Sequence, residues 1–138
     1  MCPDPLQFLT WMAAHTEHIQ LGSMVVVLPW HDPMHVAEQV SMLDNMSGDR
    51  LILGMGRGAG RVEFDGFGVP MNGSREGFVE SAEMLLKGLE QGYCEYNGKF
   101  VRHPRKANIR SGLSPSTLSR VAPMQPPCPQ NHQKSWLS

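Results

Sequence analysis

The chain is short of cysteine and of long apolar runs, and each shortage excludes a class of protein. It has 138 residues and three cysteines, Cys2, Cys94 and Cys128, an odd number without metal-ligand spacing. This usage is typical of a reducing compartment, and a disulfide stays open as the alternative. No stretch reaches the roughly 18 apolar residues of a membrane span, and the residues after Met1 do not resemble a secretion signal. We expect a cytoplasmic protein that is not in the membrane.

An excess of charge is also missing. The formal net charge is −1 at pH 7, so no basic surplus attracts nucleic acid or anionic lipid, and we expect neither as a partner. His31 and His35 stand four residues apart, a spacing that suggests a shared metal ion. Asp32 and Pro33 between them form a helix start, however, which places His31 outside the helix that carries His35. We expect no metal site.

What the sequence does contain is alternating helix and strand patterns. Residues 4–16 and 32–46 each open with Asp-Pro, a helix cap followed by a first-turn proline, and carry apolar residues at helical spacing. Residues 19–28 end in an apolar run, as in a strand buried on both faces of a parallel sheet, and residues 50–55 predict a second strand. Together they predict a β-α-β unit. The fold class is therefore α/β.

Two further elements follow. Residues 74–90 predict a helix with one apolar face, and residues 93–101 predict a hairpin because Asn97-Gly98 separates two short β-prone runs. Between the second strand and this helix we expect a long loop, since residues 60–73 are polar, rich in glycine and interrupted by Pro70.

The segment 50–68 is the most informative for function. An apolar strand ends in Gly54, Gly56, Gly58 and Gly60, which allow a ligand to approach the backbone, and Arg57 supplies donors for an oxyanion such as phosphate. The string also matches the dinucleotide pattern G-x-G-x-x-A, but that motif needs a helix directly after the glycines, and the predicted loop argues against it. We expect a site for a planar cofactor with a phosphate tail.

Several segments in combination resemble the bacterial luciferase-like family of flavin-dependent monooxygenases. They are VVVLPWHDPMHVAEQVSMLDNMSGDRLILGMGRG, EFDGFGVPMNGSRE and GYCEYNGKF, and the resemblance covers residues 5–103. It implies a TIM (β/α)8 barrel of which this chain holds part, beginning partway through the barrel, with an irregular C-terminal tail.

The resemblance also implies the roles of particular residues. Arg57 and Arg75 correspond to arginines that hold the flavin phosphate; Gly56, with Gly58 beside it, lies where the strand passes the isoalloxazine ring. Met24 and Val25 correspond to the part of the preceding strand that lies against the ring system. The residues alone leave two alternatives open. Arg57 could pair with Glu63 or Asp65, and Arg75 could be an ordinary residue of the first helical turn. His31 is a candidate catalytic residue at the pocket mouth, and the alternative is that it has a structural role only.

By resemblance the activity is oxygenation of an organic substrate by reduced flavin mononucleotide (FMN) and O2. The implied partners are a flavin reductase as electron source and a second subunit in a homo- or heterodimer. Two alternatives stay open: a dehydrogenase that uses the deazaflavin coenzyme F420 in the same barrel, and a non-catalytic fragment that docks onto another barrel subunit through the helices at residues 4–16 and 32–46.

Residues 104–138 differ in composition from residues 1–103, being rich in Pro and Ser with little periodicity. We interpret residues 1–103 as the partial barrel domain and residues 104–138 as a disordered or irregular tail. Another reading frame over residues 119–135 permits family-like sequence. A frameshifted translation from about residue 108 is therefore a further hypothesis, which sequencing of the transcript would test.

Overall fold

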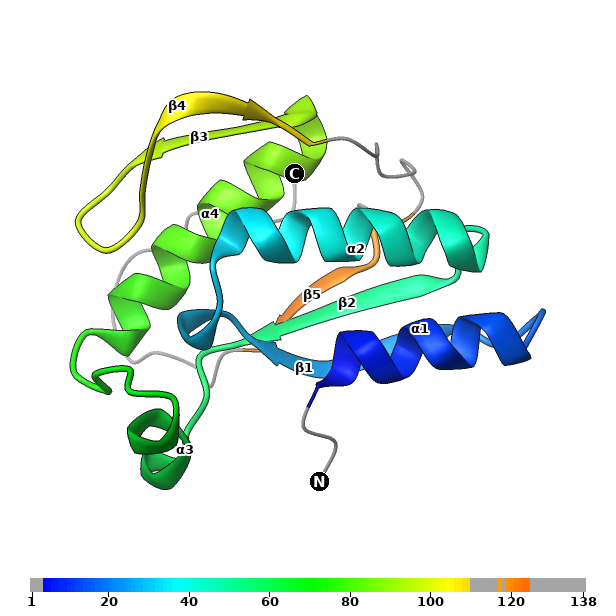
Figure 1. Ribbon diagram of the computed structural model, residues 1–138, viewed down its shortest axis with the longest axis horizontal. Coiled ribbons are helices and arrows are strands. Elements are labelled where there is room, and N and C mark those ends of the chain that lie inside the picture. Colours follow the sequence, from blue (N-terminus) through cyan, green and yellow to red (C-terminus); the bar gives the residue numbers. More distant parts are fainter. Residues whose placement is uncertain (1–3, 110–116, 118, 125–138) are drawn as a thin grey trace.

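The computed structural model describes residues 4–109, 117 and 119–124, and Figure 1 shows their arrangement. The elements in chain order are α1 (Pro5–His15), β1 (Leu21–Val27), the short 3-10 helix η1 (Leu28–Trp30), α2 (Pro33–Ser47), β2 (Leu51–Gly56), α3 (Arg61–Gly66), α4 (Ser74–Gln91), β3 (Tyr93–Asn97), β4 (Arg102–Asn108) and β5 (Val121–Met124). The α/β class predicted from the sequence is confirmed.

The two Asp-Pro starts form as the sequence predicted. The Asp4 carboxylate accepts a hydrogen bond from the Gln7 backbone N–H at 3.0 Å, and the Asp32 carboxylate accepts one from the His35 N–H at 3.0 Å. Each satisfies a donor that the first helical turn leaves without a carbonyl partner. The end of α2 is set by Gly48, whose φ of 65° is a conformation that glycine adopts without steric cost.

The strands β1, β2 and β5 form one sheet in the order β1-β2-β5, with both pairs parallel. Helix α1 packs against β1 and α2, and α2 packs against β2 and α4. The expectation that β1 is buried on both faces is wrong: Leu21, Ser23 and Val26 are buried, but Gly22 is exposed and Met24 is 82% exposed. The apolar run reflects a strand with one face against the helices and one open face.

The predicted hairpin is present, but its second strand starts later and runs further. β3 and β4 pair antiparallel, and residues 98–101 connect them. β4 ends at Asn108, so the expected domain boundary at residue 103 falls inside a strand. β5 also lies in the region that the sequence assigned to an irregular tail, and it pairs with β2. For these residues that expectation is corrected, because strand pairing outweighs a proline-rich composition.

The loop expected at residues 60–73 contains a short helix, α3, which the sequence did not predict. Phe64 in this helix is fully buried and meets the Trp30 ring edge-on, with centroids 5.6 Å apart. One aromatic anchor in a six-residue helix produces no detectable periodicity. In the part of the chain that the structure describes, no helix is long and apolar enough to cross a membrane.

Candidate functional site

The carboxyl ends of β1 and β2 converge between η1 and α3 (Figure 1), where ligands bind in parallel α/β sheets. Just before this edge, the register between Ser23 and Val26 shifts, so that Met24 and Val25 form a β-bulge. The Ser23 hydroxyl bridges the gap: it accepts from the Gly54 N–H at 2.9 Å and donates to the Gly54 carbonyl at 3.1 Å. Bulges of this kind re-aim side chains next to active sites.

The glycines of β2 and its loop pack against the chain itself. A Cβ built on Gly56 would lie 2.7 Å from Cγ2 of Val25, and one built on Gly58 would lie 2.7 Å from Cγ1 of Val27. Gly58 also has a φ of +78°, which disfavours other residues. The structure thus places Gly56 directly against Val25, so a larger residue at position 56 would require the Val25 side chain to shift.

Arg57 follows β2 directly and is half-buried. The alternative in which it pairs with Glu63 or Asp65 is not what the structure shows, because Asp65 faces Arg61, with Nε and Oδ2 4.0 Å apart. Among the residues described, none forms a hydrogen bond or ion pair with Arg57. A guanidinium held at a strand end without a counter-charge suits an anionic ligand.

Arg75 and Met24 are both exposed. Arg75 lies in the first turn of α4 and has no ion pair within the described part of the chain, while Met24 projects from the bulge on the open face of the sheet. The six residues expected to hold the cofactor therefore come from three elements: the bulge of β1, the end of β2 with its loop, and the start of α4.

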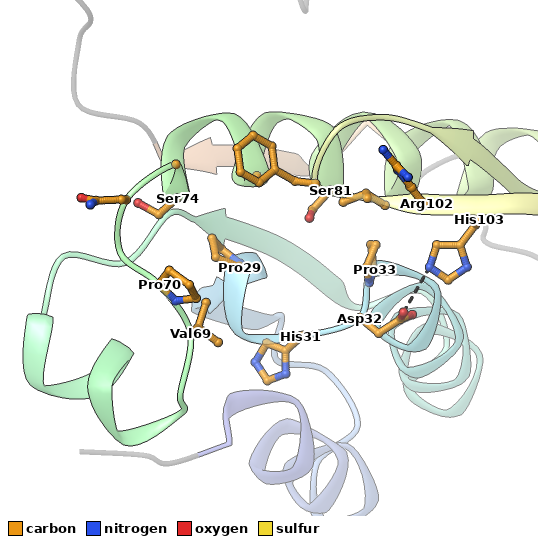
Figure 2. Close-up of a pocket in the computed structure, with 15 residues that line it drawn as sticks. Pro29, His31, Asp32, Pro33, Val69, Pro70, Ser74, Ser81, Arg102 and His103 are labelled. Atoms are coloured by element: carbon orange, nitrogen blue, oxygen red, sulfur yellow. Dashed lines mark hydrogen bonds and ion pairs between the residues drawn. The ribbon is translucent and has the colours of Figure 1, made fainter.

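A pocket of about 540 Å³ lies beside this edge (Figure 2), between the start of α4, the loop that follows η1, residues 69–73 and the hairpin. His31 is one of its lining residues. The residue is exposed overall, but protein atoms around the ring partly bury it. This burial lowers the pKa of His31; Asp4 acts to raise that pKa and His35 lowers it further.

Sequence reasoning missed two polar groups of this pocket. His103 Nε2 and Asp32 Oδ2 lie 3.1 Å apart, which ties the start of β4 to the start of α2. Ser81 lies in the middle of α4 and also lines the pocket. A cap at Asp32 was visible in the sequence, but no local pattern indicates its contact with a residue 71 positions away.

The hairpin is fastened to α4 by two carboxylates. Glu80 accepts backbone N–H bonds from Lys99 at 3.0 Å, Phe100 at 2.7 Å and Val101 at 2.9 Å. Glu83 accepts a hydrogen bond from the Tyr96 hydroxyl at 2.9 Å. Burial first, and then this bond to Glu83, raise the pKa of Tyr96 to about 12. The donors collected by Glu80 are withdrawn from the sheet ladder, which explains why β4 starts only at Arg102.

We expect the Glu80 contact to fail at low pH. Burial acts to raise the pKa of Glu80, but the three backbone N–H groups and Lys99 outweigh it and bring the pKa below its usual value of 4.5. The bonds are therefore complete above pH 4.5 and are lost as pH falls through the lower, folded-state pKa. The amide resonances of Phe100 and Val101 should titrate with a midpoint below 4.5.

The variant Glu80→Gln should abolish that titration, whereas the matched variant Glu83→Gln should keep it. A titration of the same two amides that survives in Glu80→Gln would contradict the assignment.

Comparison with known proteins identifies the family. The sequence model of the luciferase-like monooxygenases matches residues 1–122. The chain belongs to this family. It is 30% identical over 131 residues to the oxygenase component of a flavin-dependent trigonelline monooxygenase from Acinetobacter baylyi, an alignment that covers 94% of this chain and 33% of the relative.

Solved structures agree on the fold of this luciferase-like chain. The monooxygenase RslO1 from Streptomyces bottropensis has a TM-score of 0.75 and 30% identity, and the match covers 81% of this chain and 34% of that one. The coenzyme F420-dependent tetrahydromethanopterin reductase from Methanopyrus kandleri has a TM-score of 0.68 and 26% identity, over 87% and 38% of the two chains. The fold is thus part of the luciferase-like TIM barrel, and the chain spans about a third of the length of the curated relatives it matches.

Proposed function

We propose that this chain forms part of an FMN-dependent monooxygenase that transfers one oxygen atom of O2 to an organic substrate. The observation that carries the proposal is Arg57, a half-buried cation at the carboxyl end of β2 without a counter-charge in the described structure. A relative that shares 30% identity with this chain is flavin-dependent. When bound, reduced flavin supplies the reaction with O2, and the protein positions it and excludes water.

The residues of this chain fit such a cofactor. Arg57 and Arg75 provide two guanidinium groups for a phosphate dianion, from the loop after β2 and from the first turn of α4. Met24 and Val25 on the bulge, with Gly56 and Gly58 across the strand pair, offer an apolar surface and narrow backbone for a flat ring. The lowered pKa of His31 favours the neutral imidazole at pH 7, which makes it a candidate proton acceptor.

Removal of the Arg57 guanidinium is expected to weaken FMN binding by about 10- to 100-fold, the usual effect of losing a charge-assisted hydrogen bond. Quenching of flavin fluorescence on titration with the full chain measures this. Arg61→Ala is the matched control, since Arg61 lies in the next helix and faces Asp65. Equal affinities of Arg57→Ala and Arg61→Ala would contradict the assignment, as would an affinity of the unaltered chain weaker than about millimolar.

A deazaflavin coenzyme is the second candidate, because the F420-dependent reductase shares the fold at 26% identity. The two cofactors differ in the ring and in the length of the phosphate-bearing tail. Parallel titrations of the same chain with FMN and with coenzyme F420 separate them: preference for F420 by tenfold or more would replace monooxygenation with hydride transfer as the proposed reaction.

The proposed protein partners are supported by the family relationship and by the surface of the chain. The trigonelline relative is an oxygenase component, which supports a flavin reductase as the source of electrons. Helices α1 and α2 also carry exposed apolar side chains, which support contact with a second subunit: Phe8 is 50%, Trp11 56%, Met42 52% and Met46 56% exposed. That subunit is either the partner in a dimer or a full barrel to which this chain binds without taking part in catalysis. We propose a cytoplasmic location for this assembly.

A further inference from the structure

The loop that carries Arg57 packs against three apolar side chains. Gly58 follows Arg57 directly, and a Cβ built on Gly58 would lie 3.3 Å from Cζ2 of Trp30. The same Cβ would lie 3.2 Å from Cε2 of Phe64 and 2.7 Å from Cγ1 of Val27. Because close packing on this scale resists displacement, the backbone next to Arg57 has little freedom to move. The position of Arg57 therefore depends on the side chains around Gly58.

Trp30 is the centre of an aromatic cluster that joins the end of β1 to α3. It lies in η1, which follows β1 directly. Its ring stacks on Phe67, with centroids 4.9 Å apart and an angle of 23° between the planes, and it meets the Phe64 ring edge-on. Phe64 comes from α3, and Phe67 is the C-terminal cap of that helix. The cluster thus connects the two elements that flank the Arg57 loop (Figure 1).

This cluster is separate from the main core of the chain. Phe64 is fully buried, yet it is not among the buried residues that form the continuous core of sheet, helices and hairpin. The indole N–H of Trp30 is buried and has no hydrogen-bond partner among the described residues. Packing, and not a hydrogen bond, therefore fixes the orientation of the Trp30 ring. The ring surface is what Trp30 contributes to the loop.

We propose that Trp30 is a positioning residue that keeps the Arg57 guanidinium in place for the phosphate of the cofactor, an inference that rests on the proposed FMN site. Trp30 acts through the Gly58 backbone and not by contact with the phosphate. An arginine whose backbone is held loses less conformational freedom when it binds an anion, which raises the affinity for the phosphate. Binding of the ring depends on the bulge at Met24 and Val25, so the effect should be confined to the phosphate.

Comparison of FMN with riboflavin, which has the same ring and no phosphate, isolates this effect. In flavin fluorescence titrations of the full chain, Trp30→Leu should weaken FMN by about 10-fold and riboflavin by less than about 2-fold, because only the charge-assisted contact is affected. Trp30→Phe keeps an aromatic ring and should recover part of the FMN affinity. Equal weakening of FMN and riboflavin by Trp30→Leu, or a loss in Trp30→Phe as large as in Trp30→Leu, would overturn the inference.

Val40→Ala is the matched control for a loss of stability. Val40 is fully buried in α2 and belongs to the main core, which the aromatic cluster does not join. This variant should leave the ratio of the FMN and riboflavin affinities unchanged. If Val40→Ala lowers that ratio as much as Trp30→Leu does, the role of Trp30 is only structural.

A double-mutant cycle tests whether Trp30 acts through Arg57. In the Arg57→Ala background, Trp30→Leu should cause no further loss of FMN affinity. A full loss in that background would refute the role assigned to Trp30. If Arg57→Ala weakens FMN and Trp30→Leu does not, the inference about Trp30 fails while the FMN site stands.

Backbone order in the flavin-free chain provides an independent measurement. Nitrogen-15 relaxation should give lower order parameters for the amides of Arg57 and Gly58 in Trp30→Leu than in the unaltered chain or in Val40→Ala. Unchanged order parameters would overturn the inference without any flavin. Lower order in a chain that does not bind FMN would support the contact of Trp30 with the loop and contradict the proposed function alone.

Discussion

Replacing Gly54 by alanine is expected to lower the free energy of unfolding by about 3 kcal/mol. A Cβ at this position would lie 2.2 Å from the backbone carbonyl oxygen of Ser23 on the adjacent parallel strand. That oxygen cannot rotate away as a side chain can. The Ser23 hydroxyl also bonds both the N–H and the carbonyl of Gly54, so separating the strands would break those bonds as well.

Gly22→Ala is the matched control. Gly22 lies on β1 one residue before Ser23, and a Cβ there would meet nothing within 4 Å. Urea unfolding of the full chain, followed by circular dichroism, should give Gly22→Ala a midpoint close to that of the unaltered chain and Gly54→Ala a much lower one. If both variants unfold at the same urea concentration, the close approach of β1 to β2 at the bulge is not present in solution.

Replacing Arg50 by methionine is expected to cost about 2–3 kcal/mol, because several carbonyls would lose their only charged donor. The Arg50 guanidinium donates to the carbonyls of Ala13 at 3.1 Å, Thr16 at 2.9 Å and Ile19 at 3.0 Å, and to the Thr16 hydroxyl at 2.9 Å. Its Nε bonds the Ser47 carbonyl. One side chain thus joins the end of α1, the loop before β1 and the end of α2.

Arg50→Lys distinguishes geometry from charge. Lysine keeps the positive charge near the α1 carbonyls but lacks the planar fork that reaches several acceptors at once. We expect Arg50→Lys to recover less than half of the stability lost in Arg50→Met, measured by the same urea unfolding. Full recovery by lysine would mean that charge alone, through its interaction with the helix end, accounts for the role of Arg50.

The sequence by itself determined the α/β order, the two capped helices and the β-α-β unit. These features depend on residues within a few positions of one another, such as Asp4 with Gln7 and Asp32 with His35, and local hydrogen bonds follow local sequence. The family resemblance was also carried by contiguous segments, and the family match confirmed it. The roles assigned to Arg57, Arg75, Met24 and Val25 stay predictions.

Only the tertiary structure decided the features that join distant residues. The bulge at Met24 and Val25 depends on Ser23 meeting Gly54, 31 residues away, and the late start of β4 depends on Glu80 capturing the hairpin N–H groups. Helix α3 is held in place by the contact between Phe64 and the Trp30 ring, and β5 is held by its parallel pairing with β2.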